Sequence, residues 1–64
     1  MTDREYEVFS LVGQGRMSKE IAEELGIAVR TVETHRKAIC KKMEVSGPEL
    51  VRRASIYLHT SLPR

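Results

Sequence analysis

The sequence predicts a small single domain that is entirely α-helical. Three observations predict this fold class. The chain has 64 residues, too few for more than one domain. Apolar residues recur at helical spacing along nearly all of it, and glycines divide that pattern into four pieces. The dividing positions are Gly13 and Gly15, Gly26, and Gly47 followed by Pro48.

The first helix is expected over about residues 2–12. Thr2 is followed three residues later by Glu5, which is the spacing of a capping box, in which each side chain satisfies a backbone N–H group of the other residue. Met1 and Tyr6 stand at the positions of a hydrophobic staple. The inward stripe consists of Val8, Leu11 and Val12, with Phe9 beside it.

A second, shorter helix is expected over about residues 18–25, followed by a tight turn. Ser18 is a favourable N-cap residue, and Gly26 is a natural C-terminal stop. The residues expected to face inward are Ile21, Ala22 and Leu25.

The third helix is expected over about residues 29–43, and its two faces differ in chemistry. With about 100° between successive residues, Val32, Ile39 and Met43 fall on one apolar stripe, with Val29 at its edge. The opposite face is polar and mostly basic. It consists of Arg30, Glu33, Thr34, Lys37 and Lys41.

The fourth helix is expected over about residues 48–60, because Pro48 is favoured at a first helical position. Its apolar arc is wider than packing on one small core requires, which leaves two interpretations: core packing only, or a core face together with a dimer contact. The arc consists of Leu50, Val51, Ala54, Tyr57 and Leu58, with Leu62 as a further candidate. The last residues, through Pro63, are expected to fray.

Charge is segregated along the chain, although the net charge is only +2. Residues 1–25 hold three basic and six acidic side chains, a net charge of −3, whereas residues 30–43 hold five basic side chains and one acidic one, a net charge of +4. A basic helix on an otherwise balanced domain is typical of a nucleic-acid-binding protein. Two short helices joined by a tight turn, with the second basic on its outer face, indicate a helix-turn-helix.

Composition disfavours several classes of protein. The single cysteine, Cys40, excludes an internal disulfide. No apolar run approaches the length of a membrane span, and acidic residues stand where a signal peptide would need an apolar stretch. We therefore expect a cytoplasmic protein without membrane contact. His35, Cys40 and His59 lack the paired spacing of a zinc site, so no metal or other cofactor is expected.

Three stretches carry a resemblance to a known family: TDREYEVFSLVGQG, SKEIAEELGI and TVETHRKAICKKMEV, in this order and spacing. They resemble the opening, the scaffold helix and the recognition helix of the LuxR-type helix-turn-helix family, the DNA-binding domain of many bacterial response regulators and quorum-sensing regulators. The resemblance covers essentially the whole chain. It implies a four-helix domain whose third helix enters the major groove and whose fourth helix forms a dimer contact.

The resemblance implies sequence-specific binding of double-stranded DNA in bacterial transcription regulation, as a homodimer on DNA, with an upstream regulatory domain and RNA polymerase as further partners. Glu33, Thr34 and Lys37 match positions where family members contact bases, and Arg30 and Lys41 lie close to them on the same face. The residues expected at the DNA backbone are Lys19, Thr31, His35 and Arg36. Those expected at the dimer interface are Leu50, Val51, Ala54, Tyr57 and Leu58.

Two departures from the family pattern concern the third helix. Ala28 stands at its N-cap, where the family usually has Ser or Thr, and an alanine there costs about 1 kcal/mol. Glu33 stands where relatives often have a basic residue. A carboxylate accepts a hydrogen bond from cytosine N4 but repels phosphate, so the target sequence of a relative cannot be copied to this chain.

Most of the residues expected to contact DNA also have a purely structural interpretation. Arg30, Lys37 and Lys41 are also compatible with an ordinary solvated face, and Lys19 with simple exposure. Thr31 suits a local cap as well as a phosphate contact. Arg36 either presents its head to phosphate or pairs with a carboxylate of the scaffold helix. The ring of His35 is expected to be packed and hydrogen-bonded, and Cys40 to pack as a small apolar residue.

The sequence leaves two rival functions to consider. A helical adaptor that binds an acidic protein partner would use the same basic helix, but its binding would be indifferent to duplex DNA. An enzyme is not expected, because nothing in the sequence places a nucleophile beside a base in a cleft.

Overall fold

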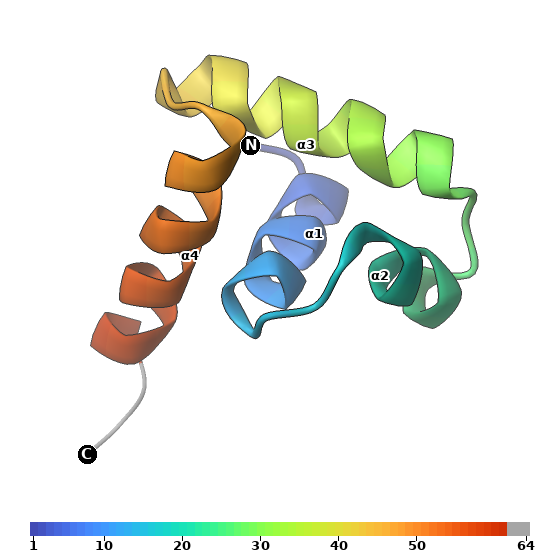
Figure 1. The fold of residues 1–64 in the computed structure, drawn as a ribbon, viewed down its shortest axis with the longest axis horizontal. Coiled ribbons are helices and arrows are strands. Elements are labelled where there is room, and N and C mark those ends of the chain that lie inside the picture. Colours follow the sequence, from blue (N-terminus) through green and yellow to red (C-terminus); the bar gives the residue numbers. More distant parts are fainter. Residues whose placement is uncertain (62–64) are drawn as a thin grey trace.

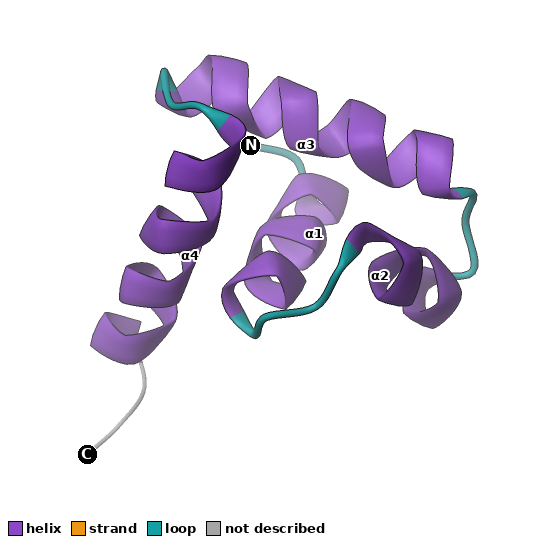
Figure 2. Ribbon diagram, in the orientation of Figure 1, coloured by secondary structure: helices purple, strands orange, loops and turns teal. Residues whose placement is uncertain are grey.

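The computed structural model describes the backbone of residues 1–61 and the side chains of residues 1–58. This part of the chain forms four helices: α1 (Asp3–Gly13), α2 (Ser18–Leu25), α3 (Val29–Met43) and α4 (Gly47–Ser61). Figure 2 shows helices joined by short loops and no strand in the described residues. The predicted all-α class is therefore confirmed. Among the described helices, none has the length and apolar character that a membrane crossing requires.

The three other helices surround α1. Figure 1 shows α3 running along one side of the molecule, with α4 at one of its ends and α2 near the other. α1 contacts α2, α3 and α4, and α3 contacts all three of the others. This arrangement fixes one side of α3 to the rest of the domain and leaves its opposite side free.

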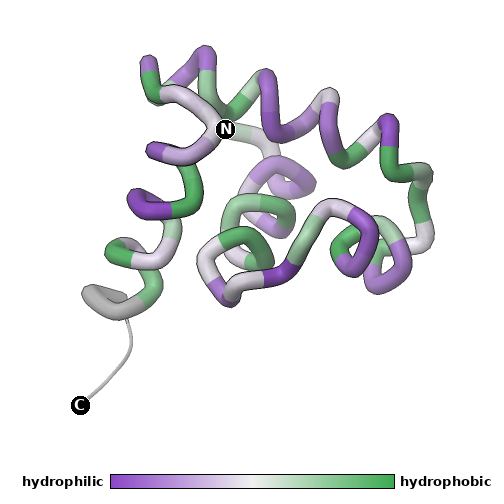
Figure 3. Tube along the Cα trace, viewed as in Figure 1, coloured by the Kyte–Doolittle hydropathy of each residue, from purple (hydrophilic) through white to green (hydrophobic). Residues whose placement is uncertain are grey.

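The core draws on all four helices. Figure 3 shows hydrophobic and hydrophilic stretches alternating along the helices, as amphipathic helices require. The side chains with no exposed surface are Val8 of α1, Ile21 of α2, Val32 and Ile39 of α3, and Leu50 and Ala54 of α4. The inward stripes expected for the first three helices are thus confirmed at these positions.

Gly13 lets the end of α1 approach α4 closely. A Cβ atom at this position would lie 2.7 Å from the carbonyl oxygen of Ala54 and 2.7 Å from Cδ1 of Leu58. The backbone oxygen cannot rotate away as a side chain could. The close contact between α1 and α4 therefore requires a glycine here, and the role of Gly13 in marking the end of the first helix is secondary.

The start of α1 has the predicted capping box, whereas the start of α2 differs from the prediction. The backbone N–H of Thr2 donates to Oε1 of Glu5 over 2.8 Å, and the N–H of Glu5 donates to Oγ1 of Thr2 over 3.1 Å. In α2 the N-cap is Met17, whose N–H donates to Oε1 of Glu20 over 2.8 Å. Ser18 is the first helical residue, and its hydroxyl bonds to another helix instead of capping its own.

The exposure of Met1 and Tyr6 differs from that of a closed staple, since the two residues keep 44% and 48% of their surface exposed. The first helix of the core therefore begins with its apolar flanking residues only half covered.

α4 begins one residue earlier than predicted. Ser46 Oγ accepts a hydrogen bond from the N–H of Glu49 over 3.4 Å, and Gly47 is the first helical residue. Pro48 therefore occupies the second helical position, where its missing N–H group is also unneeded.

The apolar arc of α4 is divided by the fold. Leu50 and Ala54 are fully buried within the monomer, whereas Val51 and Tyr57 are 40% and 48% exposed. Tyr57 packs edge to face against Phe9 of α1, with 5.4 Å between the ring centroids. Ile56, which the arc did not include, is also exposed. Leu62 and Pro63 lie outside the described residues.

Candidate nucleic-acid interface

The outer face of α3 presents all five residues predicted to contact bases. Because Val32 and Ile39 are fully buried on the inner side, the rotation of the helix about its axis is fixed. The residues exposed on the other side are Arg30, Glu33, Thr34, Lys37 and Lys41. Val29, placed at the edge of the apolar stripe, is 45% exposed and lies at the margin of this face.

Three cationic side chains on this face have no partner within the described part of the protein. Arg30, Lys37 and Lys41 make no side-chain hydrogen bond or ion pair with any described residue. Thr34 donates its hydroxyl hydrogen to the carbonyl oxygen of Arg30 over 3.0 Å, a bond within the helix. The positive charges of the face are therefore available to an anionic ligand.

Unlike the three cationic side chains of this face, Glu33 has a partner on another helix. Its Oε1 accepts a hydrogen bond from the hydroxyl of Ser18, the first residue of α2. This hydrogen bond joins α2 to the outer face of α3. Glu33 was expected to contact bases, and Ser18 was expected to cap α2.

The turn between α2 and α3 sets the position of the outer face. Gly26 takes the left-handed backbone conformation, with φ of 68°, as predicted for the end of α2. The N–H of Ile27 donates to the carbonyl oxygen of Ala22 over 3.0 Å, and the side chain of Ile27 packs against the core. Ala28 is the N-cap of α3 and provides no side-chain cap, as the sequence implied.

The residues predicted at the DNA backbone differ in exposure. Lys19 and Thr31 are exposed, whereas His35 and Arg36 are half-buried. Arg36 lies in a shallow groove of about 320 Å³ that Met17, Ser18 and Val51 also line. Within the described part of the chain it forms no ion pair, so the alternative of pairing with a scaffold-helix carboxylate is wrong.

Two smaller expectations for α3 have different outcomes. The ring of His35 is half-buried as expected, but it makes no side-chain hydrogen bond to a described residue, so the expected hydrogen-bonded ring is wrong. Cys40 packs against the core cluster, which confirms its role as a small apolar residue.

A partly buried ion pair, which the sequence did not predict, holds the end of α3 to α1. Nζ of Lys42 lies 2.7 Å from Oε1 of Glu5, and the Glu5 residue is only 6% exposed. The hydrogen bond from Lys42 and the backbone N–H of Thr2 together lower the pKa of Glu5 to about 2. The link stabilises the basic helix from its inner side while the free cations face outward.

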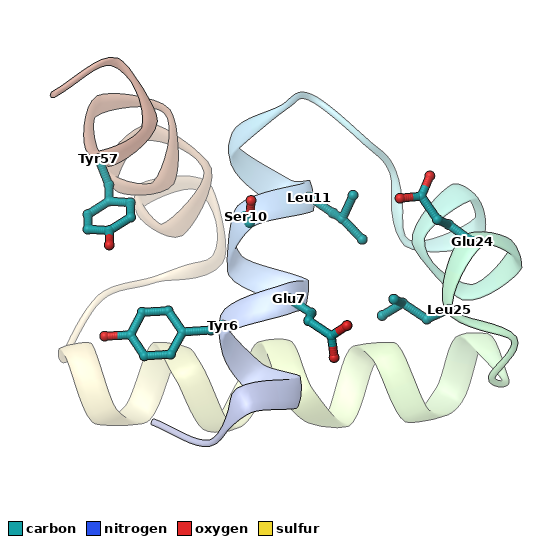
Figure 4. Close-up of a pocket in the computed structure, with 7 residues that line it drawn as sticks. All are labelled: Tyr6, Glu7, Ser10, Leu11, Glu24, Leu25 and Tyr57. Carbon is teal, nitrogen blue, oxygen red and sulfur yellow. The ribbon is translucent and has the colours of Figure 1, made fainter. Parts of the chain in front are cut away.

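A second groove lies on another part of the surface, between α1, α2 and α4. Figure 4 shows Tyr6 and Tyr57 on one side of it and Glu24 and Leu25 on the other. Its volume is about 480 Å³. Its two carboxylates are already paired: Glu7 with Arg4 at 3.7 Å, and Glu24 with Arg16 at 2.6 Å. The groove therefore offers little charge for a ligand.

Metal ligands do not gather anywhere in the described part of the chain, which contains no cluster of three or more His, Cys, Asp and Glu residues. The side chain of His59, one of the three residues considered for zinc, lies outside that part.

Comparison with known proteins places this geometry in a family. The family model described as "Bacterial regulatory proteins, luxR family" matches residues 1–54. The tetrathionate response regulatory protein TtrR of Salmonella typhimurium is 50% identical over 54 residues, which cover 83% of this chain and 26% of that protein. The transcriptional regulatory protein LiaR of Bacillus subtilis is 41% identical over 59 residues, covering 92% of this chain and 26% of that protein.

The oxygen regulatory protein NreC of Staphylococcus carnosus is 44% identical over 55 residues, covering 84% of this chain and 25% of that protein. The chain thus spans about a quarter of the length of these three curated relatives. No solved structure matches it. Because the family model covers most of the chain and the four helices have the expected order, the chain belongs to the luxR family of bacterial regulatory proteins and forms its helix-turn-helix domain.

Proposed function

We propose that this domain binds double-stranded DNA sequence-specifically in bacterial transcription regulation, with α3 in the major groove. One observation carries the proposal: Arg30, Lys37 and Lys41 project, without a partner among the described residues, from the exposed face of a helix whose other face is buried. Membership of a family of bacterial regulators supports it. Regulation through DNA, rather than catalysis, is the role that this family match favours.

The dimensions of α3 suit the major groove. An α-helix with its side chains is about 10–12 Å across, and the major groove is about 12 Å wide. We assign base contacts to Lys37 and Thr34, with Arg30 and Lys41 beside them. Glu33 is also assigned to the bases, where its carboxylate would accept a hydrogen bond. Lys19, Thr31, Arg36 and His35 are assigned to the phosphate backbone, where they fix the register of the helix without reading sequence.

A homodimer on DNA is proposed through α4. Since Leu50 and Ala54 are fully buried within the monomer, they support the fold and offer no surface to a partner. The remaining members of the predicted set, Val51, Tyr57 and the half-buried Leu58, carry the proposed contact. A two-fold dimer would read half-sites about one helical turn apart.

The setting of the domain is proposed from its relatives. The names of TtrR and LiaR describe a response regulatory and a transcriptional regulatory protein, each about four times the length that the match covers. We therefore propose an upstream regulatory domain as a partner of this module, RNA polymerase as its downstream partner, and the bacterial cytoplasm as its location.

A salt titration tests the DNA proposal. If about four phosphates are neutralised per monomer, log K falls against log salt with a slope of about −0.9 for each. Fluorescence anisotropy of labelled duplexes at several salt concentrations measures this slope. Sequences selected from a random duplex pool should bind far more tightly than a scrambled duplex. Polyglutamate serves as the control, because an adaptor for acidic proteins would bind it as well as DNA. No duplex binding at low salt would rule the proposal out.

A further inference from the structure

Glu33 is the only acidic residue of α3, and a residue from another helix fixes its side chain. Ser18 of α2 donates its hydroxyl hydrogen to Oε1 of Glu33. Arg30 and Lys37 stand three residues before and four residues after Glu33, at spacings where ion pairs form along a helix. Within the described residues, neither of these two cationic side chains forms an ion pair with the Glu33 carboxylate. Its position is therefore set by the junction between α2 and α3, although it is exposed.

A carboxylate at this place has a narrow choice of DNA ligands. It accepts hydrogen bonds and donates none when ionised. Phosphate oxygens repel the carboxylate, so contact with the DNA backbone would be unfavourable. In the major groove the matching donors are exocyclic amino groups, and the one that carboxylates characteristically read is N4 of cytosine. With Oε1 held by Ser18, Oε2 is left to accept from such a group.

We propose that Glu33 selects cytosine at one position of the DNA site and that Ser18 is the positioning residue for this contact. This inference rests on the proposed function, since it requires that α3 lies in the major groove. Immobilising a long flexible side chain on binding weakens affinity by about 2- to 10-fold. The hydrogen bond from Ser18 already restricts the Glu33 side chain in the free protein. Less of its conformational freedom is then lost on binding DNA, and the carboxylate is oriented before DNA binds.

The experiment begins with sites selected by the unaltered domain from a random duplex pool. Single base-pair changes are then scanned across the best site by anisotropy. Glu33→Gln should reduce the preference for cytosine about fivefold or more at one position, because it replaces a charged group that only accepts by a neutral amide, whose donor and acceptor together suit adenine. Ser18→Ala should reduce the preference at that same position by about 2- to 10-fold. Preferences elsewhere and the salt slope should stay unchanged.

Three further variants separate positioning from simple stability. Ser18→Thr retains the hydroxyl and should retain the cytosine preference. The double variant Ser18→Ala/Glu33→Gln should be no less selective at the cytosine position than Glu33→Gln alone, because the serine acts through the carboxylate. Ser55→Ala is the matched control. The hydroxyl of Ser55 also links two helices, since it donates to the carbonyl oxygen of Gly13 over 3.4 Å, but these helices are α4 and α1 and not α3. It should lower stability without altering base preference. Thermal melts confirm that each variant is folded.

Several results would overturn the inference. Ser18→Ala could weaken every duplex equally, which would make Ser18 a phosphate ligand. It could instead lower the melting temperature and leave the cytosine preference intact, which would make the bond purely structural. An unchanged preference in Glu33→Gln would remove Glu33 from the bases. If the unaltered domain binds no duplex, the proposed function and this inference both fail. If it binds selectively and the Ser18 variants match it, the inference alone fails.

Discussion

Lys42 of α3 and Glu5 of α1, 37 residues apart, meet at 2.7 Å across the inner side of the basic helix. The lysine side chain is half exposed, whereas the carboxylate is almost fully covered. A positive charge of the basic helix is thereby committed to the fold and not to a ligand. Lys42 is consequently unsuited as a neutral control in a binding experiment, since removing it leaves a buried carboxylate with fewer partners.

The first prediction concerns acid stability. The pKa of Glu5 falls from 4.5 to about 2 on folding. The stability that this group contributes is therefore fully present above about pH 4.5 and is lost as the pH falls towards 2. Glu5→Gln should be less stable than the unaltered domain at pH 7, and the difference should disappear near pH 2. Urea unfolding across this range measures it. Lys42→Ala should reproduce the loss at pH 7, and Lys41→Ala, at the neighbouring exposed lysine, should not. A difference that stays constant with pH would contradict the assignment.

The second prediction concerns the start of α3. Ala28→Ser should stabilise the domain by about 1 kcal/mol, because the new hydroxyl can accept from the unsatisfied N–H groups of the first turn. The same exchange at Ala38, in the interior of α3, should lower the free energy of unfolding by about 0.5 kcal/mol, because serine is a poorer helix former. Urea unfolding of both variants makes the comparison. Equal effects at the two positions would show that the first turn is already satisfied.

The third prediction compares two glycines. Gly13→Ala should destabilise the domain by about 1–3 kcal/mol, since the added Cβ must push the backbone of α4 away. Gly47→Ala places its Cβ in open space, so it should be neutral or stabilising by less than about 1 kcal/mol. Thermal or urea unfolding distinguishes the two. A Gly13→Ala variant as stable as the unaltered domain would mean that α1 and α4 separate at little cost.

The fourth prediction concerns base readout. Lys37→Ala should cost about 1–3 kcal/mol on the best DNA site and relax the preference at one position. Lys19→Ala, at the exposed start of α2, should weaken all duplexes evenly and reduce the salt slope by about 1. Anisotropy titrations against matched and mutated duplexes measure both effects. If the two variants lower every sequence by one common factor, the reading face is assigned wrongly.

The fifth prediction concerns the proposed dimer. Val51→Glu should abolish cooperative filling of a duplex with two half-sites and leave binding to a single half-site nearly unchanged. The 40% exposure of Val51 makes a folded variant reasonable to expect. Val51→Thr, of similar shape and without charge, is the matched control and should retain cooperativity. Undiminished cooperativity in a folded Val51→Glu variant would exclude this face of α4 from the dimer contact.

The sequence was informative where structure follows from neighbours along the chain. The capping box of Thr2 and Glu5, the stop at Gly26 and the bounds of α3 depend on residues within a turn or two of one another. The contacts it missed join distant residues: Ser18 to Glu33, 15 apart, and Lys42 to Glu5, 37 apart. No periodicity encodes such partners. Ser18 illustrates the limit, since its hydroxyl suits an N-cap but donates instead to Glu33 on another helix.

The apolar arc of α4 shows a related limit. Periodicity gives the width of an apolar face but not how much of it the monomer covers. Leu50 and Ala54 turned out to be fully buried, and Ile56, outside the arc, turned out to be exposed. The division could be made only once the position of α1 against α4 was known.

The packing of Tyr57 against Phe9 gives the protein an intrinsic spectroscopic reporter. The chain contains no tryptophan and only two tyrosines, so its near-ultraviolet circular dichroism comes chiefly from Tyr6 and Tyr57. Tyr57 has a neighbouring ring that fixes its surroundings, and that signal fades when tertiary packing is lost. The far-ultraviolet signal reports the helices themselves. Release of α4 from α1 and melting of the helices can therefore be followed separately in unlabelled protein.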